Sequence, residues 1–233
     1  MNENAPRKSA ARLLLEMLVV VASILIAFSL DAWWSRRSEL RTERAHLRAL
    51  QSDFEQNVAR LNQLIAREER IVDASRRLLL VATSAQAGHP DSVRTLLGQV
   101  FNSGRFDPVM GAYEAVVSSG GLAQVRDDRL RLALADFASL LQGRYTERYS
   151  DELYFDFVRS FTGQLGFTAA VLSLDSAGPA QPAAVSQRGL LLDAKFREHL
   201  ALRYLAERDV AGTYRGLLSK AQEVLDLTQR ALR

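Results

Sequence analysis

The sequence predicts an all-α protein in which an N-terminal transmembrane helix is followed by a long helix and an antiparallel helical bundle. Three observations predict this fold. One uninterrupted apolar stretch lies near the N-terminus, and apolar residues recur every three or four positions through most of the remaining chain. The chain also has only 5 prolines, a composition that favours helix. We therefore expect a short basic tail over residues 1–12, a transmembrane helix over 13–34 and a helical bundle over 35–233.

The apolar stretch is long enough to span a bilayer. From Leu13 to Leu30 its only polar residues are Glu16, Ser23 and Ser29. Extended through the tryptophans at 33 and 34, it comprises about 22 residues, or about 33 Å of helix, against a hydrocarbon core of about 30 Å.

Trp33 and Trp34 stand where an aromatic belt anchors a helix at the membrane–water interface. A cleaved signal peptide is the alternative, because a basic region precedes the stretch and Ala27-Phe28-Ser29 matches a small-x-small cleavage pattern. The length of the apolar run and the tryptophan pair favour a retained anchor.

Basic residues lie on both sides of this helix, so they favour opposite orientations in the membrane. Counting charges alone slightly favours the C-terminal side as cytoplasmic. A short basic tail before a first membrane helix usually stays inside, and this favours a bundle outside the cytoplasmic membrane, which we adopt. The basic residues are Arg7, Lys8 and Arg12 before the stretch, and Arg36, Arg37, Arg41, Arg44 and Arg48 after it.

The chain from residue 35 to about 85 contains no proline or glycine. This predicts one long helix that can be continuous with the membrane span. Its apolar residues fit one heptad frame with two core positions. Four polar residues interrupt that frame, so we expect the apolar stripe to pack on the rest of the domain rather than on a second coiled-coil strand. The core residues are Leu40, Leu47, Phe54 and Leu61, then Leu50, Leu64, Ile71 and Leu78; the interruptions are Glu43, Asn57, Glu68 and Ser75.

Shorter helices are expected after a break at residues 88–91. Asp91 or Ser92 would cap a helix from about 93 to 102. Asp107 and Pro108 read as the N-cap and first residue of another helix. That helix would run to about Ser118, where Gly120-Gly121 would stop it.

Two more long helices complete the predicted bundle. The first is capped by Asp127 or Asp128 and carries an aromatic-rich stripe as far as Phe161. Residues 167–187 are rich in alanine, serine, glycine and proline and predict a flexible loop. Asp193 would cap the last helix, which runs to the C-terminus. The stripe comprises Leu130, Leu134, Phe137, Leu141, Tyr145, Tyr149, Leu153, Phe157 and Phe161.

Several classes of function lack their usual signals. The chain has no cysteine, which excludes disulfides and thiolate metal sites. The histidines at 46, 89 and 199 are too far apart in sequence to form a recognisable metal motif, and no phosphate-binding glycine loop occurs. The formal charge is only +3, with acids and bases intermixed along the helices, so we expect neither a nucleic-acid partner nor a cofactor.

One region combines polar and turn-forming residues closely enough to be a candidate functional site or a structural joint between two helices. Glycines there suit a helix stop, an aspartate can cap the following helix, and an arginine lies one turn further on. The candidate residues are Tyr113, Glu114, Ser119, Gly120, Gly121, Asp128 and Arg131.

Two stretches carry a resemblance to a known protein family. One runs from Val20 to Trp34, and the other from Ala112 to Leu122 with Asp128 and Arg131 just after it. Together they resemble an uncharacterised bacterial family of single-pass, membrane-anchored proteins with a helical domain. The resemblance implies a domain outside the cytoplasmic membrane and implies no catalytic residues.

These observations favour a non-enzymatic, membrane-tethered helical domain that binds or scaffolds a protein partner, or a second copy of itself, near the bilayer. An extracytoplasmic small-ligand-binding domain that acts through a partner is the alternative, because the aromatic stripe would suit a pocket. An enzyme is the third hypothesis, and its polar side chains would have to converge in a cleft.

Overall fold

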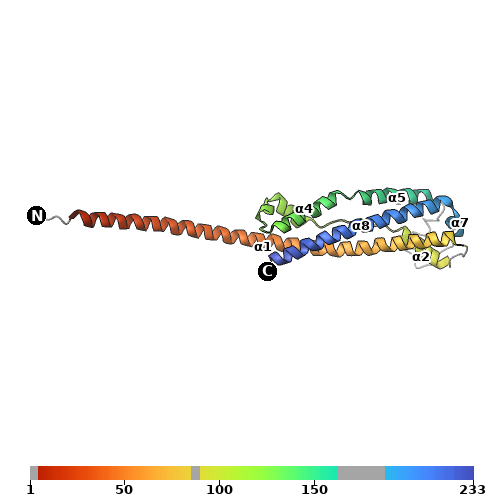
Figure 1. Ribbon diagram of the computed structural model, residues 1–233, viewed down its shortest axis with the longest axis horizontal. Helices are drawn as coiled ribbons and strands as arrows, with labels where there is room; N and C mark the ends of the chain where they lie inside the picture. The colour runs from red at the N-terminus through yellow and green to blue at the C-terminus, as the bar shows by residue number, and fades with distance from the viewer. Residues whose placement is uncertain (1–4, 85–89, 162–186) are drawn as a thin grey trace, which may run out of the picture.

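The computed structural model describes residues 5–84, 90–161 and 187–233, and all regular structure in these residues is helical (Figure 1). This confirms the all-α prediction. The elements are α1 (Ala5–Thr83), α2 (Pro90–Val100), α3 (Gly111–Ser118), the short 3-10 helix η1 (Gly121–Gln124), α4 (Asp128–Gln142), α5 (Tyr145–Phe161), α7 (Gln187–Leu192) and α8 (Ala194–Ala231).

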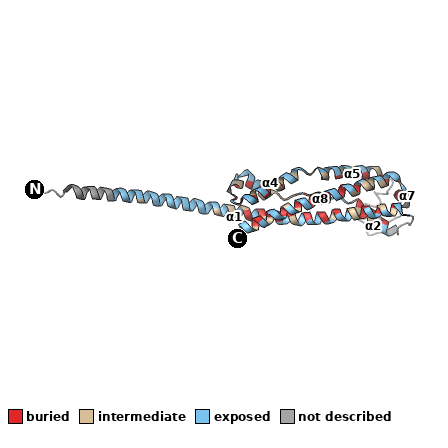
Figure 2. Ribbon diagram, in the orientation of Figure 1, coloured by how far each residue is buried: buried red, intermediate tan, exposed pale blue. Residues whose placement is uncertain are grey.

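Helix α1 is unbroken from Ala5 to Thr83, so the apolar stretch and the heptad stripe belong to one helix. Its N-terminal half projects alone from the bundle, and residues 15–39 are exposed apart from the half-buried Ala22 (Figure 2). This half contains an apolar window of mean hydropathy 2.1, none of it buried by the rest of the chain, and is long and apolar enough to cross a membrane. The predicted core stripe is confirmed from Leu47 to Leu78, while Leu40 is half-buried.

The bundle is built around α8, which packs along α1 on one side and along α4 and α5 on the other. Helix α8 runs antiparallel to α1, and its C-terminus returns to the place where α1 leaves the bundle (Figure 1). Helices α4 and α5 follow each other end to end. Between α1 and α5, residues 101–110 run lengthwise without forming a helix and connect α2 at the far end to α3 at the near end. We call residues 101–110 the inner segment.

The core consists of two apolar clusters. The near cluster includes Phe54, Phe137 and Tyr214, and the far cluster includes Phe157 and Phe196. Buried polar side chains lie between them along the bundle. These are Glu68 on α1, Glu147 and Ser150 on α5, and Arg203 and Glu207 on α8. We call these five residues the polar layer.

Two of the predicted N-caps are confirmed. Asp127 caps α4 by accepting hydrogen bonds from the backbone N–H groups of Arg129 and Leu130, and Asp193 caps α8 through the N–H of Phe196. Gly120 has a φ of 69°, as predicted for a residue that stops α3. Helix α7 was not predicted. The predicted loop at 167–187 lies outside the described residues, apart from Gln187.

Two predicted helix starts are wrong. Helix α2 begins at Pro90, so Asp91 and Ser92 lie inside it rather than capping it. Helix α3 begins at Gly111 rather than at Pro108. The cause is tertiary: the Asp53 carboxylate of α1 accepts a hydrogen bond of 2.7 Å from the N–H of Ala112, which supplies the cap from another helix.

The single helix predicted over 128–161 is also wrong, because the chain breaks at Gly143 and Arg144 into α4 and α5. The break changes which residues face the core. Tyr145 and Tyr149 of the predicted stripe are 67% and 50% exposed, whereas Phe157 and Phe161 remain buried.

This changed register can be tested by replacing two aromatic residues of the predicted stripe. Phe157→Ala should lower the free energy of unfolding by about 3–5 kcal/mol, because it removes a buried ring from a packed core. Tyr149→Ala, at an exposed position of the same helix, should change it by less than about 0.5 kcal/mol. Urea unfolding of both variants followed by circular dichroism measures the difference. Equal losses would mean that both rings face the core.

Candidate functional site

The inner segment is held in place by side chains rather than by backbone pairing. Only its two ends bond to the backbone of the adjoining helices: the N–H groups of Phe101 and Asn102 donate to carbonyls of α2, and the carbonyl of Met110 accepts from an N–H of α3. Between these ends the segment belongs to no helix or sheet, and backbone groups are costly when they are shielded from water and left unpaired. On the α1 side, Asn57 satisfies both groups of Val109: its amide donates to the carbonyl at 2.8 Å and accepts from the N–H at 2.7 Å. Arg60 donates to the carbonyl of Asp107 at 2.7 Å.

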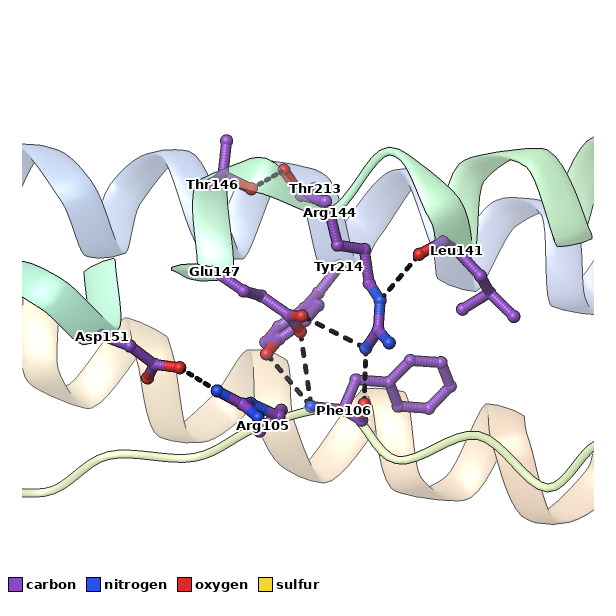
Figure 3. A network of polar contacts seen from close by, with 9 residues as sticks. All are labelled: Arg105, Phe106, Leu141, Arg144, Thr146, Glu147, Asp151, Thr213 and Tyr214. Carbon is purple, nitrogen blue, oxygen red and sulfur yellow. Dashed lines mark hydrogen bonds and ion pairs between the residues drawn. The ribbon is translucent and has the colours of Figure 1, made fainter. Parts of the chain in front are cut away.

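On the opposite side, α5 and α8 hold the segment at Phe106 (Figure 3). The N–H of Phe106 donates to the Tyr214 hydroxyl at 3.2 Å and to the Glu147 carboxylate at 3.4 Å. Arg144 donates to the carbonyl of Phe106 at 2.5 Å and pairs with Glu147 at 3.1 Å. Burial, and next the Glu147 carboxylate, raise the pKa of the Tyr214 phenol, so this hydroxyl stays neutral.

Arg144, which bonds to the inner segment, also bonds to the C-terminal end of α4. Arg144 follows Gly143 at the break between α4 and α5, and its Nε donates to the carbonyl of Leu141 at 3.0 Å. Two further contacts join α5 to its neighbours (Figure 3). Asp151 pairs with Arg105 of the inner segment, and the hydroxyl oxygens of Thr146 and of Thr213 on α8 are hydrogen-bonded at 3.1 Å. The break between α4 and α5 therefore places Arg144 where it can bind the inner segment.

Further along, Arg203 of α8 performs the corresponding role at the start of the segment. It is 2% exposed and donates to the carbonyls of Val100 at 3.3 Å and Asn102 at 2.7 Å. Its guanidinium carbon lies 4.6 Å from the centre of the Tyr154 ring, an arrangement that favours a cation. Burial lowers the pKa of Arg203, while the Glu207 carboxylate opposes that shift.

Glu207 completes the polar layer around Arg203. It pairs with the guanidinium at 2.6 Å and accepts a hydrogen bond of 2.6 Å from Ser150. Glu68 of α1 lies beside Glu207 and Arg203 and is 1% exposed, yet neither of its carboxyl oxygens accepts a hydrogen bond from the described residues. The polar layer thus contains three buried carboxyl groups. Glu147 pairs with Arg144, whereas Glu68 and Glu207 lie close to the single guanidinium of Arg203.

The seven residues predicted as a site or joint gather where α3 and η1 meet α4, at the end of the bundle nearest the exposed half of α1. Tyr113 is half-buried against the near cluster, while Glu114 is exposed. The Ser119 hydroxyl donates back to the carbonyl of Val116 at 3.2 Å. Arg131 pairs with Asp128 and donates to the carbonyl of Val125 at 2.6 Å.

The glycines of this region serve the turn. Gly120 supplies the left-handed residue, and Gly121 packs against α1, where a Cβ atom would lie 3.1 Å from the His46 ring. Glu43 of α1 also accepts from the N–H of Arg126 at 3.2 Å. Gly121 and Arg126 thus lie against α1. The other predicted residues contact their own turn or the start of α4, or are exposed, and whether the seven serve as a site or as a joint stays a prediction.

Trp33 and Trp34 lie on the exposed half of α1, beyond the bundle. Their rings are 6.4 Å apart, and the Arg37 guanidinium lies 5.4 Å from the centre of the Trp33 ring. The tryptophans are 54% and 66% exposed, so nothing in the described chain covers them. Their exposure suits residues whose contacts are with something other than this bundle.

Two of the hollows on the described surface have no buried aromatic ring in their lining. One, of about 590 Å³, lies between α1 and α2 and is lined by charged and polar side chains such as Arg70, Asp73 and Thr95. The other lies on the exposed apolar helix around Leu25 and Trp33. Phe157, Phe161 and Phe196 instead pack on one another with ring centres 5.3–5.5 Å apart. At the C-terminal end of the predicted stripe, the rings therefore form a packed core with Phe196 of α8.

Sequence reasoning missed the residues that hold the inner segment and the polar layer. One signal was present: Asn57, Glu68 and Ser75 interrupt the heptad frame at core positions, and all three are fully buried. Arg203 and Glu207, one helical turn apart on α8, gave no such signal. Within the described residues, no group of three histidine, aspartate or glutamate side chains is arranged to hold a metal ion.

A family model matches residues 16–178 of the chain, and its description is Family of unknown function (DUF6090). This match agrees with the resemblance to a family without an assigned activity. No curated protein and no solved structure matches the chain.

The hydrogen bonds of Asn57 predict a specific loss of stability. Asn57→Ala leaves the N–H and C=O of Val109 without partners and should lower the free energy of unfolding by about 2–4 kcal/mol. Asn62→Ala is the matched control, because Asn62 is exposed and bonds only within its own helix, to the carbonyl of Val58. It should change stability by less than about 0.5 kcal/mol. Similar effects of both variants in urea unfolding would show that Asn57 does not hold the segment.

Proposed function

We propose that this chain, which belongs to the DUF6090 family since that model matches more than half of it, is a single-pass membrane protein whose helical bundle binds a protein partner near the bilayer. The carrying observation is the continuity of α1. One helix contains both the apolar stretch and the core stripe of the bundle, with no break between them. A bundle built on such a helix is held at a defined distance and orientation from the membrane.

The length of the free part of α1 sets that distance. In this proposal Trp33 and Trp34 lie at the interface, with Arg37 stacked on Trp33 towards the aqueous side. The first fully buried residue of the bundle is Leu47. The 13 residues from Trp34 to Leu47, counted as 47 − 34, correspond to about 20 Å of helix. The near end of the bundle, with the predicted site or joint, would face the bilayer across this gap.

We place the bundle outside the cytoplasmic membrane of a bacterium. The support is the short basic tail before the apolar stretch, which favours an N-terminus inside the cell. In this orientation the bundle reaches partners in the cell envelope.

The partner surface that we propose includes the outer face of α5. Tyr145, Tyr149 and Phe155 are 67%, 50% and 58% exposed, although they lie on a helix of the bundle. Exposed aromatic side chains grouped on one element are typical of protein interfaces, where they supply most of the binding energy. The buried polar groups hold the inner segment, and we assign them no catalytic role.

Membrane insertion and sidedness can be tested together, because the chain contains no cysteine of its own. Single-cysteine variants at Leu25 and Ser52 would be treated with a membrane-impermeant maleimide on intact cells, and again after solubilisation. We expect Ser52→Cys to react on intact cells and Leu25→Cys to react only after solubilisation. Reaction of Leu25→Cys on intact cells would contradict the membrane span. Protection of Ser52→Cys until the cells are opened would place the bundle in the cytoplasm.

The partner surface is tested by placing a photo-crosslinking amino acid at Phe155 and, in separate variants, at Tyr145 and Tyr149. Gln222 on the exposed face of α8 is the control position. We expect a discrete crosslinked species from position 155 and none from position 222. Its mass and composition would distinguish a second copy of the chain from another protein. An absence of crosslinked product at positions 145, 149 and 155 alike would contradict binding through this face.

A further inference from the structure

The polar layer has an unusual balance of charge. Glu68 of α1 and Glu207 of α8 are 1% and 4% exposed, and the guanidinium of Arg203 is the buried cation beside them. That guanidinium is already engaged by Glu207 and by two backbone carbonyls. Glu147, the third carboxyl group of the layer, has Arg144 as its own partner. If Glu68 and Glu207 were both ionised, these two groups and Arg203 would together carry a net negative charge with little access to water, an arrangement that is strongly unfavourable.

The surroundings of Glu207 stabilise its ionised form. It receives the Arg203 guanidinium at 2.6 Å and the Ser150 hydroxyl at 2.6 Å. Glu68 receives no hydrogen bond on either oxygen from the described residues. A carboxyl group in such surroundings is most stable when it keeps its proton, which it can then direct towards its anionic neighbour.

We propose that the bundle contains a proton-binding site between Glu68 and Glu207, and that this proton joins α1 to α8 beside the inner segment. The proton is taken up from solvent when the bundle folds. It is bound to Glu68 and lies towards the Glu207 carboxylate, so that the group formed by Glu68, Glu207 and Arg203 contains one anion and one cation.

The surroundings of Glu68 support this assignment from each element packed near it. Burial first, then hydrogen bonding to Glu207 and the negative charge of Glu207, raise the pKa of Glu68 to about 9, against the opposing effect of Arg203 and Arg67. The inner segment presents backbone carbonyls to Arg203 and Arg67. The other titratable or charged groups around the layer are Tyr214 on α8 and Glu147, Asp151 and Tyr154 on α5.

A raised carboxyl pKa has a definite effect on stability. Between the ordinary value of 4.5 and about 9, the folded chain binds one more proton at Glu68 than the unfolded chain does. Folding is therefore favoured at the acid end of this range. The contribution of Glu68 to the folding equilibrium constant falls about tenfold for each pH unit of increase, and becomes constant above the folded-state pKa.

The test compares the full chain in detergent micelles with Glu68→Gln, which keeps the shape and removes the titration. The control is Glu69→Gln, an exposed neighbour that pairs with Arg215 on the surface. Unfolding by urea is followed by circular dichroism between about pH 6 and pH 8. The quantity compared is the folding equilibrium constant of Glu68→Gln divided by that of the native chain. We expect this ratio to increase about tenfold for each unit by which the pH is raised. Glu69→Gln should give a ratio that does not change with pH.

A constant ratio for Glu68→Gln would overturn the proposal, because Glu68 would then bind no extra proton on folding. If Glu68→Gln does not fold, infrared spectroscopy of the native chain at neutral pH decides the matter. We expect the C=O band of a protonated carboxyl group, and we expect this band to disappear above about pH 10, beyond the folded-state pKa. Absence of the band at neutral pH would overturn the proposal.

Discussion

The structure of the bundle depends on the hydrogen bonds that hold the inner segment, a stretch of chain that is not helical. The inner segment lies between α1 and α5, where its backbone groups are shielded in part from water and, between the two ends of the segment, belong to no helix or sheet. Such groups must be hydrogen-bonded, because an unpaired one costs about as much as several ordinary surface contacts contribute. Side chains from three helices supply the bonds, so the segment ties together elements that are far apart in sequence. The contributors are Asn57, Arg60 and Arg67 on α1, Glu147 and Tyr154 on α5, Arg203 and Tyr214 on α8, and Arg144 at the break before α5.

This requirement also accounts for charge inside the bundle. Arg203 has to be buried to reach the carbonyls of Val100 and Asn102, and a buried guanidinium requires a carboxylate, which Glu207 provides. The polar layer therefore separates two apolar clusters that would otherwise form one continuous core. Glu68 then lies next to a carboxylate without a cation of its own, and this leads to the proposed proton.

The elements that could be predicted from the sequence are those governed by local patterns. The periodicity of α1 and the capping aspartates at 127 and 193 depend on residues within a few positions of each other, and the structure confirms them. The start of α3 and the break before α5 depend on Asp53 and on Arg144, whose partners come from distant parts of the chain. The site was missed for the same reason. Asn57 and Glu68 were visible only as interruptions of a heptad, and their partners lie more than 50 residues away.

The central claim is that side chains hold the inner segment as firmly as a helix holds its own backbone, and amide hydrogen exchange of the full chain in micelles tests it most directly. The N–H groups of Phe106, Val109 and Ala112 donate to side chains of Tyr214, Asn57 and Asp53. These three amides should exchange as slowly as core amides of α1 near Leu61, because opening any of them requires the bundle to separate. Exchange at the rate of an exposed loop, with α1 still protected, would show that the segment only rests on the bundle and would contradict the account.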